Sequence, residues 1–98
     1  MGSETDYRRY MTTTKKEAEK QFMADQAQSA YEDGNSYSGC IGVLPRGVTW
    51  VSEIFPSALD AERHITINHE KWEPAMGAGF ADDAGDLCGF SIGGWCSS

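Results

Sequence analysis

The apolar residues in the first third of the chain recur at the spacing of a helix. Thr14 and Glu17 stand three residues apart, which is the form of a capping box at a helix start. Apolar side chains then return every three or four residues until Gly34, a residue type that often ends helices. They are Ala18, Phe22, Met23, Ala27, Ala30 and Tyr31. The pattern predicts one amphipathic helix over residues 15–33.

The middle and the C-terminal part of the chain alternate between apolar residues and polar or small ones, which is the period of β-strands. Two hairpins are expected, because turn-forming residues separate each pair of alternating segments. The turns are Leu44-Pro45-Arg46-Gly47 and the polar run Asp82-Asp83-Ala84-Gly85-Asp86. The predicted strands are residues 37–43, 48–55, 76–80 and 88–92.

A second helix is predicted between the two hairpins. Ser57 and Asp60 can cap its start, and Pro74 prevents it from continuing. One face of this helix carries Ala58, Ala61, Ile65, Asn68 and Trp72. We therefore expect a helix over residues 58–71, and we expect Trp72 to hold its end in the core.

Taken in order, these elements predict an α+β fold of the form α-β-β-α-β-β. Two hairpins imply a four-stranded antiparallel sheet, and two amphipathic helices can both cover one of its faces. A chain of 98 residues corresponds to one domain, which we place at residues 13–98. Residues 1–12 are mostly polar, so we expect them to form a flexible N-terminal tail.

The charge of the chain changes between its two halves. Residues 1–46 carry seven Asp or Glu and six Lys or Arg, whereas residues 47–98 carry eight Asp or Glu but only Arg63 and Lys71. The net charge of −7 argues against direct binding to nucleic acid, which depends on cationic side chains. The same charge attracts a basic protein surface. Neither a membrane-spanning apolar run nor a signal-peptide core is seen, so we expect a cytoplasmic protein.

The residues that could bind a metal do not form a metal-binding pattern. Zinc sites usually combine two closely spaced pairs of ligands. On a continuous strand Cys88 and Cys96 would lie about 26 Å apart, and His64 and His69 would diverge around a helix. We therefore predict no metal and no cofactor. With Cys40 the chain has three cysteines, an odd number that favours reduced thiols.

The sequence also lacks the common patterns of enzymes. The turn at 82–86 does not have the spacing of an EF-hand calcium loop, and Gly77-Ala78-Gly79 lacks the third glycine of a dinucleotide-binding loop. Glu70 and Glu73 stand where the end of a helix is solvated. We therefore do not expect an enzyme. The alternative left open is a small metal- or thiol-dependent enzyme or sensor that uses Cys40, Cys88 and Cys96 with His64 or His69.

Acidic residues beside aromatic ones are a common composition for a protein-binding surface. Aromatic side chains contribute binding energy, and charge steers the association. The candidate residues are Glu53, Asp82, Asp83, Asp86, Trp50 and Trp95. We predict a non-enzymatic protein that binds a basic, nucleic-acid-binding surface of another protein. The Gly-rich strands at 75–81 and 87–92 specify their register weakly, which favours a homodimer.

Three segments resemble short accessory proteins that are encoded by phages and mobile elements. They are residues 57–65, residues 68–76 and the terminal Gly93-Gly94-Trp95-Cys96. The resemblance rests on residues that pack helices and strands. It implies a small acidic inhibitor of host machinery, similar in kind to the anti-CRISPR proteins, and it assigns no functional residue. The chain is less acidic than extreme DNA mimics, so the resemblance does not imply wholesale mimicry of DNA.

Overall fold

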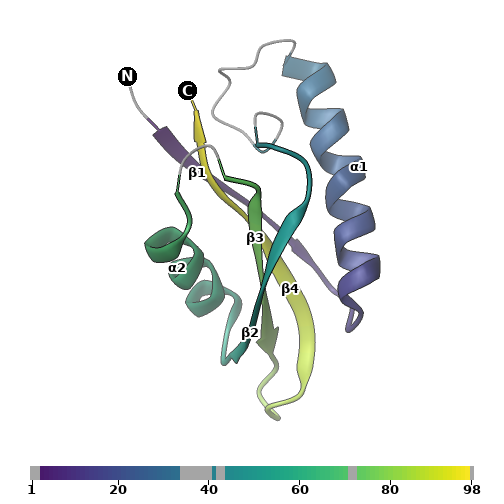
Figure 1. Ribbon diagram of the computed structural model, residues 1–98. Helices are drawn as coiled ribbons and strands as arrows, with labels where there is room; N and C mark the ends of the chain where they lie inside the picture. The colour runs from purple at the N-terminus through teal and green to yellow at the C-terminus, as the bar shows by residue number, and fades with distance from the viewer. Residues whose placement is uncertain (1–2, 34–40, 42–43, 71–72, 98) are drawn as a thin grey trace.

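The computed structural model describes residues 3–33, 41, 44–70 and 73–97. Within these residues the helices and strands follow one another in the order β1-α1-β2-α2-β3-β4 (Figure 1). Their bounds are β1 Ser3–Tyr10, α1 Lys15–Asp33, β2 Val48–Phe55, α2 Ala58–Asn68, β3 Ala75–Ala81 and β4 Leu87–Ser97. Two helices and one four-stranded sheet make this an α+β protein, as predicted.

The four strands form a mixed sheet in the order β1-β4-β3-β2. β4 pairs antiparallel with both β1 and β3, whereas β2 pairs parallel with β3. The predicted antiparallel sheet is therefore wrong for the β2–β3 pair. Parallel neighbours need a crossover connection, and α2 supplies it between β2 and β3. The strand predicted at 37–43, as a hairpin partner of β2, lies outside the described residues except for Ile41, which is buried.

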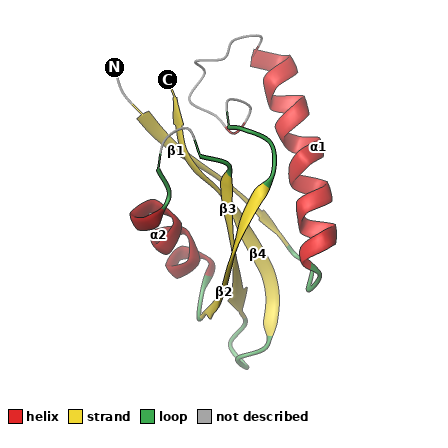
Figure 2. Cartoon of the chain, viewed as in Figure 1, coloured by secondary structure: helices red, strands yellow, loops and turns green. Residues whose placement is uncertain are grey.

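The two helices cover opposite faces of the sheet, which is the middle layer of three (Figures 1 and 2). On one face α1 contributes Ala18 and Phe22 to a cluster with Phe90 and Ile92 of β4. On the other face α2 packs Ala61 and Ile65 against Ala78 and Phe80 of β3. The expectation of two helices on one face is thus wrong. α1 connects the two edge strands, β1 and β2, and it spans the face that α2 leaves free.

The N-terminal segment forms a strand, which corrects the prediction of a flexible tail at residues 1–12. β1 pairs with β4 from Ser3 opposite Ser97 to Tyr10 opposite Phe90. Its two tyrosines have partners elsewhere in the chain: the Tyr7 and Thr66 hydroxyls are hydrogen-bonded, and Tyr10 donates to Asp25 Oδ2 at 2.7 Å. These bonds, with the strand pairing, hold the segment in place although it is mostly polar.

The remaining predicted elements are found with shifted ends. α1 and β2 have the predicted bounds, whereas β3 and β4 are longer than predicted. Ser57 caps α2 as expected, because its hydroxyl accepts from the Asp60 N–H at 3.2 Å. α2 ends at Asn68, three residues before the predicted end. β4 continues to Ser97 because β1 pairs with it along this length.

Glycines of β3 make room for large side chains on the face that α1 covers. A Cβ at Gly77 would lie 2.6 Å from the Trp50 ring, and a Cβ at Gly79 would lie 2.9 Å from Leu87 Cδ1. Trp50 therefore lies across Gly77, where it meets the Phe90 ring edge-on with centroids 5.2 Å apart. The glycines thus allow the indole to lie close against the sheet.

Candidate protein-binding surface

Four of the predicted site residues lie at the same end of the sheet. Ile54 pairs with Gly79, so the last residues of β2 lie beside the last residues of β3. The turn at 82–86 starts just beyond that point. Glu53, Asp82, Asp83 and Asp86 are all exposed there, and we call these four residues the acidic end.

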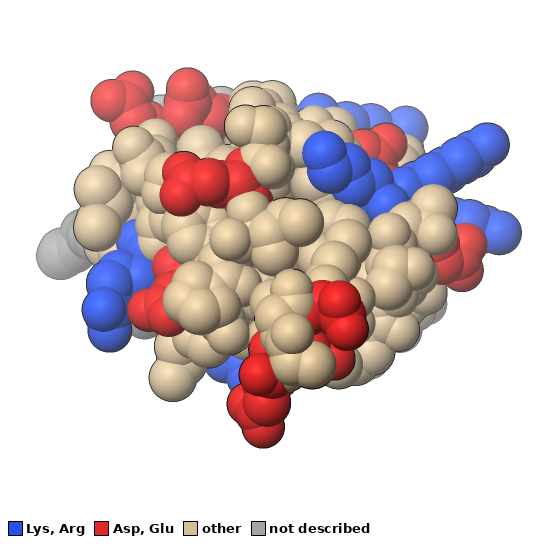
Figure 3. Space-filling view, turned by 90° about the horizontal axis from the view of Figure 1, so that it is seen from below, with Lys and Arg blue, Asp and Glu red and all other residues tan. Residues whose placement is uncertain are grey.

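The acidic end is seen from below in Figure 3. The acidic side chains form separate groups in this view and not one continuous patch, and Lys and Arg side chains lie at the right of the view and also at its left edge. Among the described residues no Lys or Arg comes within 4.0 Å of a carboxylate of the acidic end. These four carboxylates are therefore available to an external partner.

Asp82 has a structural role that the other three acids do not share. Its Oδ1 accepts from the backbone N–H of Ala84 at 2.9 Å and of Asp86 at 3.1 Å. The backbone closes the same turn, since Asp82 N donates to Asp86 O and Gly85 has a φ of 86°. A side chain that accepts from its own turn stabilises it. Asp82 therefore shapes the hairpin that presents Asp83 and Asp86.

Trp50 lies in the layer between the sheet and α1. It is half-buried, and its Nε1 donates to Glu19 Oε1 at 3.0 Å. The Lys15 ammonium lies 5.8 Å from the centre of its ring, within the range of a cation–π contact. Trp50 is thus engaged with α1, although it precedes Glu53 by only three residues.

Trp95 lies on the other face and toward the other end of β4. Its Nε1 donates to the Thr66 carbonyl at 2.8 Å, and its backbone N–H donates to His69 Nδ1 at 3.0 Å. The predicted site is therefore divided: the four acids lie together, and the two tryptophans do not join them as a pair. Trp72, predicted to lie in the core, is outside the described residues.

Two apolar side chains near the acidic end were not identified from the sequence. Ile54, beside Glu53 in β2, is 56% exposed, and Leu59 in the first turn of α2 is 66% exposed. Exposed aliphatic side chains next to unpaired charge are suited to contact with a partner. Ile54 could have been noticed in the sequence, since it adjoins Phe55 and breaks the alternation of apolar and polar residues in β2.

Glu62, another acid of the C-terminal half, is neutralised inside the chain. Both carboxylate oxygens of Glu62 accept from Arg9, at 2.8 and 3.0 Å, and Ser91 donates to the same group at 2.9 Å. Burial opposes the ionisation of Glu62, but these hydrogen bonds and the charge of Arg9 outweigh it and lower its pKa. Glu62 is therefore part of the fold and not of the partner surface.

The histidines and cysteines do not form a metal centre in the described part of the chain. No group of three or more His, Cys, Asp or Glu residues there is arranged to hold an ion. His69 is buried, with Nε2 2.9 Å from the Pro74 carbonyl and Nδ1 accepting from Trp95, so both ring nitrogens are engaged by the backbone. Cys88 directs its thiol to the Phe80 carbonyl, and Cys40 is outside the described residues.

Comparison with known proteins gives no family for this chain. A scan of protein-family models finds no match, and searches of the curated proteins and of the solved structures find none either. In the part of the chain that the structure describes, neither helix combines the length and apolarity that a membrane span requires.

Proposed function

We propose that this chain is a non-enzymatic protein that binds a basic surface of another protein through its acidic end. The observation that carries the proposal is the placement of four exposed carboxylates, Glu53, Asp82, Asp83 and Asp86, at one end of the sheet with no cationic partner in the described residues. Ile54, the neighbour of Glu53 in β2, and Leu59, in the first turn of α2, are exposed apolar side chains that follow the same end of β2 in the chain.

This arrangement supports a division of roles between charge and apolar contact. Unpaired surface charge accelerates the approach of an oppositely charged partner, while buried apolar contacts slow its dissociation. Trp50 and Trp95 are held by hydrogen bonds inside the chain, so in this proposal they stabilise the fold and do not anchor the partner.

A basic surface that attracts this protein also suits nucleic acid, because both are recognised through negative charge. By occupying such a surface, the chain would exclude the phosphates of the nucleic acid. We therefore propose an inhibitor of a nucleic-acid-binding protein, active in the cytoplasm of a host cell. The resemblance to phage and mobile-element accessory proteins supports the more specific proposal of a phage-type inhibitor of host defence, such as an anti-CRISPR protein.

The test compares two variants that have the same net charge. One carries Glu53→Gln, Asp83→Asn and Asp86→Asn; Asp82 is left intact because its side chain shapes the turn. The other carries Glu17→Gln, Glu70→Gln and Glu73→Gln, which alters three exposed acids outside the acidic end. A bacterial lysate is passed over the immobilised wild-type chain, and the association rate of each captured protein is then measured with both variants.

We expect the acidic-end variant to associate several-fold more slowly at low salt, and the control variant to resemble the wild type. A double-stranded oligonucleotide should compete with the chain for the captured protein. Equal association rates for the two variants would contradict a role of the acidic end. A captured protein that binds the chain and the oligonucleotide together would contradict the proposed inhibition.

A further inference from the structure

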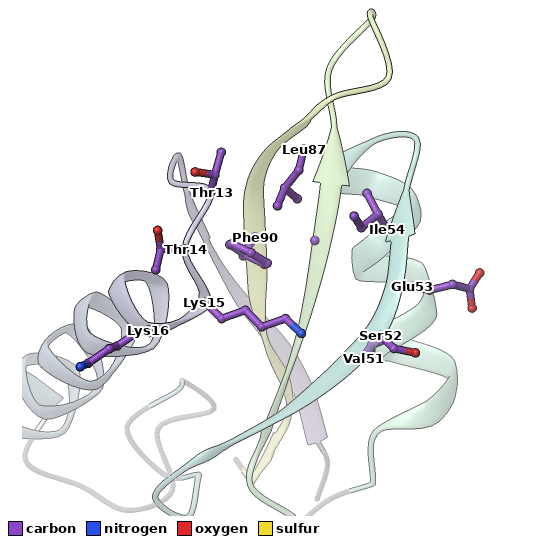
Figure 4. A pocket seen from close by; sticks show the side chains of 11 residues that line it. Thr13, Thr14, Lys15, Lys16, Val51, Ser52, Glu53, Ile54, Leu87 and Phe90 are labelled. Carbon is purple, nitrogen blue, oxygen red and sulfur yellow. The ribbon is translucent and has the colours of Figure 1, made fainter.

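A groove of about 450 Å³ lies on the α1 face of the sheet, between the start of α1 and β2 (Figure 4). Its walls come from residues 13–16 and 51–54, and its floor comes from β3 and β4. The volume is within the range of about 300–1,000 Å³ that is typical of small-molecule sites.

Two features of the sequence produce this space. Gly79 has no side chain, so Leu87 and Phe90 lie close over β3 and form the floor of the groove there. In addition, the pairing of the two strands is irregular, since Trp50 pairs with Gly77 and Ile54 pairs with Gly79. Between these two pairs β2 contains two more residues than β3, so β2 bulges away from its neighbour. Bulges of this kind redirect side chains and often occur beside functional sites.

The floor of the groove is apolar. Leu87 and Phe90 lie across it in Figure 4, and Ile54 projects from the bulged strand. Ile54 is 56% exposed. An apolar surface of this shape gains free energy when a ligand removes it from water.

One charge lies inside the groove. The Lys15 side chain extends across it, whereas Lys16 points away on the other side of α1 (Figure 4). The Glu53 carboxylate also points away from the groove. No described carboxylate lies within 4.0 Å of the Lys15 ammonium, which lies 5.8 Å from the centre of the Trp50 ring. Of the charged side chains among the described lining residues, Lys15 is therefore the one that extends over the apolar floor, whereas Lys16 and Glu53 direct their charges away from it.

We propose that this groove binds a small amphipathic anion, with its aromatic or aliphatic body on Phe90, Leu87 and Ile54 and its carboxylate or sulfonate at Lys15. The charge and the floor are complementary to such a molecule. Addition of a peptide strand to β2 is disfavoured, because the bulge and the charge of Glu53 make this edge a poor template for strand pairing. The groove shares Ile54 with the surface proposed above, but the anion's charge would be bound by Lys15 and not by the carboxylates of the acidic end, so either proposal can fail alone.

The test uses 8-anilinonaphthalene-1-sulfonate, an aromatic anion that fluoresces when it leaves water, and its uncharged analogue N-phenyl-1-naphthylamine. We expect saturable binding of the sulfonate to the folded wild type, with amide shifts in the NMR spectrum centred on residues 51–54 and 87–90. Lys15→Gln should weaken binding of the sulfonate about tenfold, the size expected for one charged hydrogen bond, and leave the neutral analogue unaffected.

Lys16→Gln is the matched control, since it removes the same charge from the next residue but from a side chain that points away. It should leave both affinities unchanged. Ile54→Ser, which removes an exposed apolar side chain from the wall of the groove, should weaken both probes equally. Absence of saturable binding, amide shifts at another place, or equal effects of Lys15→Gln and Lys16→Gln would each overturn the proposal.

Discussion

At the scale of single residues, Glu62 joins three elements of the fold. It lies in α2, accepts two hydrogen bonds from Arg9 of β1 and one from Ser91 of β4, and Ser91 is fully buried. A carboxylate that receives paired bonds from a guanidinium is held in one geometry. Glu62 makes this connection across the α2 face to Ser91 and Arg9, which lie 29 and 53 positions away from it in the sequence.

The lowered pKa of Glu62 predicts how stability depends on pH. Because the folded-state pKa lies below the ordinary value of about 4.3, the stabilisation is present above that value and is lost as the pH falls through the folded pKa. Glu62→Gln should therefore lower the free energy of unfolding by about 1 kcal/mol at neutral pH, since the pair is partly screened by water. Chemical denaturation at neutral pH and at about pH 3 measures both values.

In this experiment the difference between wild type and Glu62→Gln should be smaller at the acidic pH than at neutral pH. Glu70→Gln serves as the control, because Glu70 is exposed and the structure gives its carboxylate no partner among the described residues. A difference that is the same at both pH values would mean that the ionised carboxylate of Glu62 contributes nothing specific.

At the scale of elements, β1 determines whether β4 is a central or an edge strand. Removing residues 1–10 would expose the backbone of β4, take Tyr10 out of the core and leave Glu62 without Arg9. We expect this truncated chain to lose most of a folding free energy that is only about 5–15 kcal/mol in domains of this size, and to aggregate through the new edge. Thermal unfolding followed by circular dichroism compares it with a chain that lacks only residues 1–2. Equal midpoints would show that β1 is dispensable.

The same strand shows what could be predicted from the sequence. α1, α2, β2, β3 and part of β4 were recognised because their apolar residues recur with the period of each element. β1 has no such pattern: Tyr7-Arg8-Arg9-Tyr10 is polar, and its partners Thr66, Glu62 and Asp25 are remote in the sequence. The spacing of apolar residues predicts a single helix or strand, but it does not predict which distant residues will pair with a polar strand and bury it.

The candidate site was predictable to a similar extent. The acids were placed correctly at exposed positions, since charged residues in turns are rarely buried. Their assembly at one end could not be predicted, because it depends on the parallel pairing of β2 with β3. The division of Trp50 and Trp95 between opposite faces follows from α1 and α2 lying on different sides, which no local pattern specifies.

At the scale of the whole molecule, the structure changes the argument for a homodimer. The Gly-rich strands that suggested self-association, β3 and β4, are the central strands of the sheet and already have neighbours on both sides. Self-association would therefore use the outer edge of β1 or of β2. Two copies that each carry a net charge of −7 also repel one another.

The last prediction is that partner binding and self-association respond to salt in opposite ways. Salt screens the attraction between the acidic end and a basic partner, so association with the partner should slow as salt increases. Salt also screens the repulsion between two copies, so a dimer should form more readily at about 1 M salt, where the screening length is about 3 Å, than at low salt. Sedimentation equilibrium at high micromolar concentration measures the second effect, with the acidic-end variant as a control that should dimerise at lower salt than the wild type. Monomers at every salt concentration would rule out the homodimer. A dimer that weakens as salt increases would contradict the prediction, because it would show that attraction between unlike charges holds the two copies together.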